Sequence, residues 1–267
     1  MSTALLVINP NTSVSVTDLL QRHVQGRLGA ALQVQVQSVT ARFGAPYISC
    51  EASYAVANHA TLDAWAAACA NGQRPSAVLI GCFGDPGLFA LRDGAGVPVS
   101  GLAEAAFAAA ARHGRFAIVT GGVRWKPMLE RLAHALGHGL SPDGRLGLAG
   151  IHTVAPSGAQ LAADPVGARR LLGEACRAAA GRFQADAVIL GGAGLAGMAV
   201  DIAASVPVPL IDSVTAGAEW AEQAIRTAST AARDAASGLA GQADRVVALA
   251  GFGIAWHNVS PELAALG

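Results

Sequence analysis

Short apolar runs alternate along the chain with longer stretches in which apolar residues recur at helical spacing. The short runs have the length of buried strands and lie at Leu5–Ile8, Val34–Val39, Val78–Ile80, Val97–Val99, Phe116–Val119, Val188–Leu190 and Val208–Ile211. The longer stretches predict helices at Val14–Leu28, Ala52–Ala70, Leu102–His113, Trp125–Leu136, Pro165–Phe183 and Val214–Ala236. Strands alternating with helices of this length predict βαβ units, and therefore an α/β fold of mostly parallel sheets flanked by helices.

The pattern repeats after about 110 residues, which predicts an internal duplication. Three segments and their later counterparts carry it: Val7-Ile-Asn9 with Ile118-Val-Thr120, Leu79-Ile-Gly-Cys82 with Ile189-Leu-Gly-Gly192, and Val97-Pro-Val99 with Val208-Pro-Leu210. We expect two pseudo-symmetric lobes, one formed by residues 1–100 with about 213–267 and the other by residues 101–212. The chain from residue 238 onward holds apolar pieces at Val246–Ala250 and Ile254–Trp256 and a helix-like end at Pro261–Leu266. Its role is not predicted.

Composition and charge narrow the class of protein. Of the 267 residues, 52% are hydrophobic and 13% are charged, and the formal net charge is zero. This composition fits sheets covered on both faces, and the lack of a basic stripe argues against nucleic acid or a membrane surface as partner. No apolar stretch reaches the length of a membrane span, and the first predicted strand leaves no room for a signal peptide.

The cysteines also bear on the compartment and on metal binding. The four residues, Cys50, Cys69, Cys82 and Cys176, form no CxxC motif and have no metal-type spacing with histidine. A disulfide framework is not expected in a core of this size. We therefore expect a cytoplasmic chain with reduced thiols.

In each half, polar or glycine-rich segments follow two of the predicted strands: Leu5–Ile8 and Val78–Ile80 in the first half, Phe116–Val119 and Val188–Leu190 in the second. Because ligands of parallel α/β sheets bind beyond the carboxyl ends of the strands, we expect these segments to line one cleft between the lobes. They are Asn9-Pro-Asn-Thr-Ser13, Cys82-Phe-Gly84, Thr120-Gly-Gly122 and Gly192-Ala-Gly194. Cys82 would then lie on one wall of the cleft, and Gly192 would lie opposite.

Cys82 is the candidate acid/base. A thiol at a strand end, followed by a turn and a helix start, lies where backbone N–H groups stabilise an anion. The alternative is that Cys82 is a small buried apolar residue, which is the interpretation we favour for the other three cysteines. The same turns can hold a carboxylate or an enolate through backbone N–H groups and polar side chains. The candidate substrate-binding residues are Asn9, Asn11, Thr12, Tyr47, Phe83, Gly84, Thr120, Gly121 and Ala193.

Several of these residues have a structural alternative. Thr12 can simply cap the following helix, and Tyr47 can pack in its loop rather than reach over the cleft. Asp85 is expected to stabilise its own Asp-Pro-Gly turn. No Arg or Lys except Arg92 and Arg124 stands beside the predicted loops, which favours a neutral ring over a dianion as substrate.

Together these segments resemble a known family. Ile8-Asn-Pro-Asn-Thr-Ser13, Gly44-Ala-Pro-Tyr-Ile48, Gly81-Cys-Phe-Gly-Asp-Pro-Gly-Leu88, Gly101-Leu-Ala-Glu-Ala105 and Leu190-Gly-Gly-Ala-Gly-Leu-Ala-Gly197 resemble the hydantoin/allantoin racemase branch of the aspartate/glutamate racemase superfamily. The resemblance covers about residues 4 to 235. It implies a cofactor-free enzyme, a homo-oligomer, and two cysteines that flank the α-carbon of the substrate. Cys82 matches the first of these cysteines, whereas the second falls at Gly192, which has no side chain to titrate.

Three functions remain open. The first is a carbon-acid enzyme like the hydantoin racemases, acting on a hydantoin, an amino acid or a related small molecule. Inversion then needs a donor on each face, so water or a neighbouring Thr or Tyr would have to serve the second face. The second is a cofactor-free decarboxylase or lyase, similar in mirror fashion to arylmalonate decarboxylase, that uses one cysteine as proton donor to a malonate-like substrate. The third is a non-catalytic small-molecule binder; a chain engineered to lose its second cysteine is a further possibility, although Gly is an odd substitute beside Ser or Ala.

Overall fold

The computed structural model describes residues 4–29, 34–141, 143–156, 158–236 and 251–267. The strands are β1 (Ala4–Asn9), β2 (Gln35–Thr40), β3 (Ala77–Ile80), β4 (Val99–Gly101), β5 (Arg115–Gly121), β6 (Gly147–Val154), β7 (Ala187–Gly191) and β8 (Leu210–Asp212). The helices are α1 (Val14–Gly29), α2 (Glu51–Ala70), α3 (Leu88–Gly94), α4 (Leu102–Ala111), α5 (Trp125–Ala135), α6 (Gly158–Ala163), α7 (Pro165–Phe183), α8 (Met198–Ile202), α9 (Ser213–Ala236) and α10 (Pro261–Ala264), with short 3-10 turns η1 (Ala193–Leu195) and η2 (Ala203–Ser205). Each of the six predicted helices is present.

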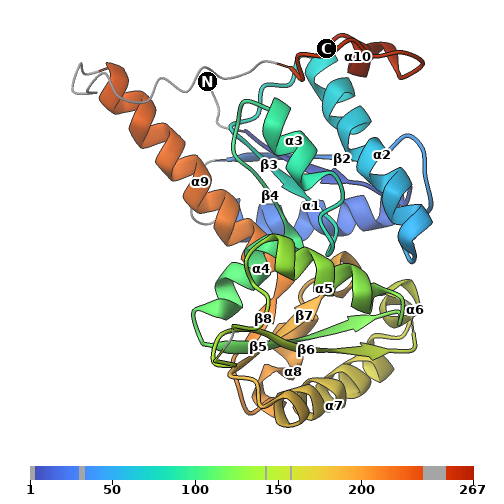
Figure 1. Ribbon diagram of the computed structural model, residues 1–267, viewed down its shortest axis with the longest axis vertical. Coiled ribbons are helices and arrows are strands. Elements are labelled where there is room, and N and C mark those ends of the chain that lie inside the picture. Colours follow the sequence, from blue (N-terminus) through green and yellow to red (C-terminus); the bar gives the residue numbers. More distant parts are fainter. Residues whose placement is uncertain (1–3, 30–33, 142, 157, 237–250) are drawn as a thin grey trace.

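The strands form two four-stranded parallel sheets, with the orders β2-β1-β3-β4 and β6-β5-β7-β8. Figure 1 shows the first sheet in the upper part of the molecule and the second in the lower part. Helices α1 and α9 contact one side of the first sheet and α2 the other, while α4, α5 and α7 contact the second sheet. The predicted class, two α/β lobes with helices around parallel sheets, is confirmed.

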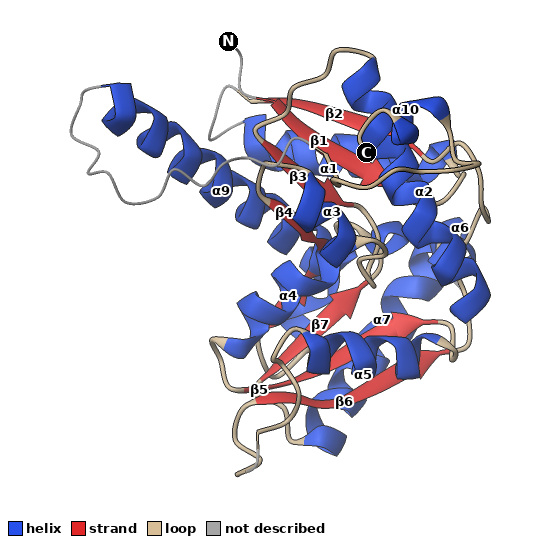
Figure 2. Ribbon diagram, turned by 45° about the horizontal axis from the view of Figure 1, so that its top comes forward, coloured by secondary structure: helices blue, strands red, loops and turns tan. Residues whose placement is uncertain are grey.

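The two sheets have the same strand order and the same register. Ile8 of β1 pairs with Ile80 of β3, and Val119 of β5 pairs with Leu190 of β7. These are the positions that the sequence repeat makes equivalent. The division of the chain into residues 1–100 with 213–267 and residues 101–212 stays a prediction, because α9 contacts α1 beside the first sheet and also α4 and β8. Figure 2 shows α9 extending away from both sheets toward its C-terminal end.

The edge strand β6 was not predicted. Its sequence, Gly-Leu-Ala-Gly-Ile-His-Thr-Val, breaks the apolar pattern with two glycines and two polar residues. Gly150 is needed there because a Cβ at this position would collide with the Phe183 ring of α7. An edge strand pairs on one side only, so its sequence is less constrained to be apolar than that of a central strand.

Two predicted strands begin later than expected. The runs Val97–Val99 and Val208–Ile211 correspond to β4 and β8, which begin just after Pro98 and Pro209. Proline has no N–H to donate to the sheet, so regular pairing starts beyond it. The proline carbonyls still accept hydrogen bonds, from Val78 N–H and Val188 N–H at 2.9 Å each.

The core lies on both faces of the central strands. Leu5, Leu6, Val7 and Ile8 of β1 are fully buried, and the described side chains of β3, β5 and β7 follow the same pattern. Continuous burial explains why these strands are apolar at successive positions rather than alternating. Cys176 of α7 is fully buried in the apolar cluster between α7 and the second sheet, in agreement with its predicted packing role.

The C-terminal segment returns to the first sheet and packs against α2 (Figure 1). The helix-like end predicted at Pro261–Leu266 is α10, whereas Val246–Ala250 lies outside the described residues. Arg42 joins the segment to α2, since its guanidinium pairs with Asp63 at 2.6 Å and with Glu262 at 2.9 Å. The Asp63 side chain is only 2% exposed, so this ion pair neutralises a buried charge. In the ranges that the structure describes, no helix is long and apolar enough to cross a membrane.

We expect Arg42→Gln to lower the free energy of unfolding by about 1–3 kcal/mol, because it leaves the buried Asp63 carboxylate without its charged donor. Urea unfolding followed by circular dichroism measures this loss. The matched variant Glu262→Gln removes only the more exposed partner and should cost much less. Equal losses in the two variants would contradict the assigned role of Asp63.

Candidate active site

A cavity of about 290 Å³ lies where the carboxyl ends of the two sheets meet. Its walls come from the segments after β1, β3, β5 and β7, from the loop at residues 46–48, and from the starts of α1 and α5. Eight of the residues singled out from the sequence line it: Asn11, Tyr47, Cys82, Phe83, Thr120, Gly121, Gly192 and Ala193. The predicted cleft between four strand-end segments is therefore present, with Cys82 and Gly192 both on its wall.

Three predicted residues are not on the wall. Asn9 is fully buried beneath the segment after β1, where its amide nitrogen lies 3.0 Å from oxygens of Asn11, Ser13 and Thr17. It therefore shapes the segment that carries Asn11. The Thr12 N–H donates to the carbonyl of Ala45 at 3.2 Å, which ties the same segment to the loop that carries Tyr47.

Gly84, the third of these residues, lies behind the cavity in the turn after β3. A Cβ at this position would collide with the Trp125 ring, which lines the cavity and was not predicted. Trp125 is the first residue of α5, so in the sequence it is part of a helical pattern and carries no mark of a cavity residue.

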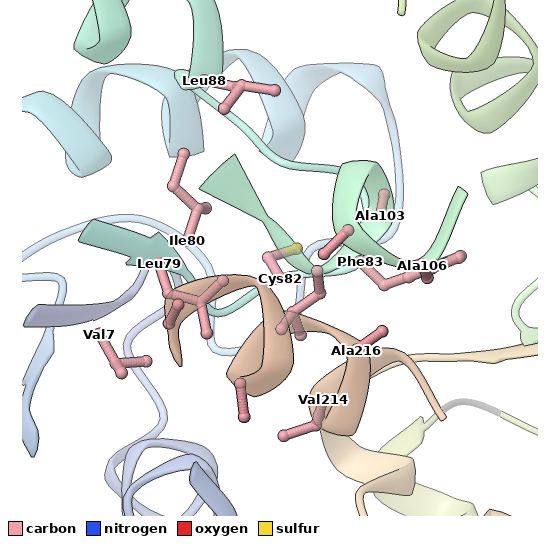
Figure 3. Packing of buried hydrophobic residues seen from close by; sticks show 14 of the residues in the cluster. Val7, Leu79, Ile80, Cys82, Phe83, Leu88, Ala103, Ala106, Val214 and Ala216 are labelled. Carbon is pink, nitrogen blue, oxygen red and sulfur yellow. The ribbon is translucent and has the colours of Figure 1, made fainter. Parts of the chain in front are cut away.

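Cys82 follows β3 and is 8% exposed. Figure 3 shows its side chain beside Phe83 of the same turn and among buried apolar residues of β3, α4 and α9, such as Ile80, Ala103 and Val214. Burial raises the pKa of the Cys82 thiol above its usual value, and the nearby Asp85 carboxyl acts in the same direction. At neutral pH the residue is therefore a protonated thiol, a form that can donate a proton.

One face of α2 holds the turn after Cys82. The Tyr54 hydroxyl donates to the carbonyl of Gly84 at 2.7 Å, and the Thr61 hydroxyl donates to the carbonyl of Pro86 at 2.9 Å. The side-chain oxygen of Asn58 accepts a hydrogen bond from the N–H of Gly87 in the same turn. Positions 54, 58 and 61 share one helix face. Three polar side chains at this spacing in an Ala-rich helix are the sequence signal that could have identified the residues holding this turn.

Asp85 was expected to stabilise its own turn, and its side chain also reaches beyond that turn. Its buried carboxylate accepts hydrogen bonds from the N–H groups of Ala103 at 2.9 Å and Glu104 at 2.7 Å, at the start of α4. Burial raises the pKa of Asp85 to about 7, while these backbone donors act in the opposite direction. A Cβ at Gly101 would collide with this carboxylate, which explains the glycine at the end of β4. Asp85 therefore ties the Cys82 turn to α4.

The Gly192 turn is held differently. The Gly192 N–H donates to the hydroxyl of Ser213 at 3.2 Å, and Asp212 accepts from Gly197 N–H at 3.0 Å while it also caps α9. Gly192 has φ 145° and ψ 130°. A Cβ built there would lie 3.5 Å from Leu195, so space is available, but the backbone conformation is one that side-chain-bearing residues rarely adopt.

Direct contacts between the lobes bring the two turns together. The Phe83 ring lies so close to Gly191 that any side chain at 191 would collide with it, and it also packs edge-on against Phe107 of α4. On the opposite wall, the Tyr47 hydroxyl donates to the carbonyl of Gly121 at 3.3 Å. These contacts join the two lobes beside the cavity, and Cys82 is the cysteine among the described residues that line it.

The two arginines that stand beside the loops in the sequence do not line the cavity. Arg92 is engaged with the carbonyl of Val99 and with Glu104, and neither Arg92 nor Arg124 lines the cavity. The cation among the described lining residues is Arg22 of α1. It lies more than two helical turns beyond the polar segment after β1, so the sequence did not indicate it as a site residue. Over the described part of the chain, no group of three or more His, Cys, Asp or Glu side chains is arranged to hold a metal ion.

The comparisons with known proteins agree with this architecture. The family model described as Asp/Glu/Hydantoin racemase matches residues 5–221. A hydantoin racemase from Pseudomonas sp. (strain NS671) is 30% identical over 219 residues, which is 81% of this chain and 83% of that protein. The chain therefore belongs to the Asp/Glu/hydantoin racemase family, a family of isomerase enzymes.

Solved structures place it near two allantoin racemases. The Klebsiella pneumoniae enzyme has a TM-score of 0.76 at 29% identity, with 99% of each chain covered. The Pseudomonas fluorescens enzyme has a TM-score of 0.76 at 26% identity, covering 84% of this chain and 92% of that one. Arylmalonate decarboxylase shares the fold, with a TM-score of 0.54 at 17% identity.

We expect the cysteines to react with iodoacetamide in a definite order. Hydrogen bonds from Ser53 lower the pKa of the partly exposed Cys50, whereas burial raises the pKa of Cys82. Cys50 should therefore be alkylated first at pH 7, and the rate at Cys82 should rise about tenfold per pH unit up to pH 9 without a plateau. Peptide mass mapping of the quenched reaction measures both rates. A Cys82 that reacts as fast as Cys50 at pH 7 would show that its thiol is ionised.

We expect Gly192→Ala and Gly192→Cys to lower the free energy of unfolding by a similar amount, about 1–3 kcal/mol, because the strain arises from the Cβ at positive φ. Thermal and urea unfolding measure the loss. Gly26→Ala is the control, since this α1 glycine has ordinary helical φ and open space around it. That variant should be stabilised by up to about 1 kcal/mol. A Gly192→Ala protein as stable as the parent would mean that the turn readily adopts another conformation.

Proposed function

We propose that this enzyme transfers a proton, without a cofactor, at a carbon next to a carbonyl group in a small ring compound, with Cys82 as the acid/base. The observation that carries the proposal is the Cys82 thiol on the wall of a largely apolar cavity between the two strand-end turns. The names of the relatives, hydantoin racemase and allantoin racemase, support five-membered cyclic ureides as the substrate class.

Stabilisation of the enolate is assigned to groups on the same walls. The N–H groups of Phe83 and Ala193 follow the two strand ends and donate to no acceptor in the described residues. The Thr120 hydroxyl and the Asn11 amide add polar contacts. Oriented donors in a site of low polarity stabilise developing negative charge more strongly than water does.

The second face of the substrate sets the limit on this chemistry. Inversion needs proton removal on one face and proton return on the other, and Gly192 supplies no titrating group. The Thr120 and Tyr47 hydroxyls, or a water molecule, are the groups that we assign to that face if the enzyme racemises. Without them, Cys82 would remove and return the proton on the same face, and exchange would proceed with retention.

A cofactor-free decarboxylase is the second candidate, and the protonation state of Cys82 favours it. Loss of CO2 from a malonate-like substrate breaks a carbon–carbon bond and leaves the electron pair on the α-carbon as an enediolate. The Cys82 thiol then gives its proton to that carbon, and water reprotonates the thiolate. One neutral donor suffices, and no base is needed to begin the reaction.

One experiment separates these functions. Enantiopure 5-substituted hydantoins, allantoin and disubstituted malonates are incubated with the protein in heavy water. Deuterium at the α-carbon is followed by NMR and enantiomeric composition by chiral chromatography. Inversion with exchange supports the racemase, exchange with retention supports one-face proton transfer, and CO2 release with a single chiral product supports the decarboxylase. No exchange and no CO2 release would overturn the proposal and leave a non-catalytic binder.

We expect Cys82→Ala to lower the exchange or decarboxylation rate by about 10²- to 10⁴-fold, the usual contribution of a general acid/base. Cys82→Ser should be similarly impaired, because a hydroxyl is a far weaker acid than a thiol. Cys50→Ala, which removes a thiol that does not line the cavity, is the control and should keep the parental rate. Retention of activity in Cys82→Ala would refute the assigned role.

A cytoplasmic location and a homo-oligomeric state stay predictions.

A further inference from the structure

Arg22 is the charged side chain among the described residues that line the cavity, and no carboxylate lies on the wall with it. Within the described part of the chain, its guanidinium forms no ion pair or hydrogen bond, unlike Arg27 in the same helix, which pairs with Glu219 and Glu222. The described residues on the cavity wall therefore include one positively charged side chain and no negatively charged one, while the exposed Asp18 lies one helical turn earlier in α1.

The position of Arg22 is fixed by the packing of α1. Ser15, Leu19 and Arg22 all line the cavity, and their spacing places them on one face of the helix. The neighbouring His23 packs over Gly197, where any side chain would crowd its ring. This contact holds the middle of α1 against the segment after β7.

The surroundings of Arg22 select for a negative ligand group. The cavity wall is mostly apolar, and Ser13 and Ser15, whose hydroxyls lie 2.9 Å apart, line it with Arg22. A guanidinium presents two parallel N–H donors that match the two oxygens of a carboxylate. A neutral substituent would gain much less from the same position.

We propose that Arg22 forms a carboxylate subsite and that the preferred substrates are rings whose substituent ends in a carboxylate. The assignment rests on the proposed function, which places the reacting carbon at Cys82. It replaces the expectation of a neutral substrate, which was based on how few Arg and Lys residues stand beside the loops in the sequence. Arg22 binds and orients the substituent and takes no part in the proton transfer.

Two ligands of matched shape test the subsite: 5-(2-carboxyethyl)hydantoin and its neutral amide, 5-(2-carbamoylethyl)hydantoin. Both are titrated by calorimetry into protein that carries Cys82→Ser, so that binding is measured without turnover. We expect tighter binding of the carboxylate. Arg22→Gln should weaken carboxylate binding by about tenfold to a hundredfold and change amide binding by less than about twofold.

Arg112→Gln is the matched control, because it removes another exposed arginine that does not line the cavity. It should leave both affinities unchanged, and higher ionic strength should weaken only the carboxylate. Equal effects of Arg22→Gln on the two ligands, or no effect on either, would overturn the subsite. If parental protein exchanges the α-proton of neither ring while carboxylate binding still depends on Arg22, the proposed function fails and the subsite stands.

Discussion

The buried carboxylate of Asp85 is the interaction on which the site depends. It accepts the first N–H groups of α4 while its backbone belongs to the turn that carries Cys82. Helix α4 in turn contacts β7 and β8 of the second sheet and α9. One side chain therefore couples the thiol to the helix between the sheets, and the polar face of α2 fixes the turn from behind. Loss of this carboxylate would leave two helix N–H groups without acceptors and free the turn to move.

In the second sheet, the turn after β7 is also held by a buried carboxylate, but that carboxylate comes from a different position in the fold. The end of β4 carries Gly101 and the end of β8 carries Asp212, and these residues hold equivalent positions in the two sheets. In the first half the carboxylate reaches from the turn to the helix; in the second it reaches from the strand end to Gly197 in the turn. The duplicated fold is thus symmetric in strand order but not in how its turns are held. This difference gives the two walls of the cavity different chemistry.

The sequence was sufficient for the parts that repeat or are continuously buried. The order of the predicted strands and helices, the offset of about 110 residues, and eight of the cavity residues followed from apolar runs and from the glycine-rich segments behind them, whereas β6 was missed. What could not be predicted depends on contacts between distant elements. Arg22 and Trp125 belong to helical patterns, and only tertiary packing shows which face of each helix meets the cavity. The same is true of Asp85, because its partner lies at the start of a different helix.

Position 192 lacks a thiol, and its backbone conformation also disfavours any residue with a side chain. The path of the turn is set by the bonds of Gly192 to Ser213 and of Gly197 to Asp212, and it leaves Gly192 at φ 145°. A cysteine would have to change this path before its sulfur could face the substrate. Gly192 therefore brings no titrating group to the cavity, whereas Cys82 brings a thiol that burial keeps protonated. A protonated thiol can give a proton but cannot remove one, so the proposed racemisation requires bound substrate to lower the pKa of Cys82, whereas the proposed decarboxylation does not.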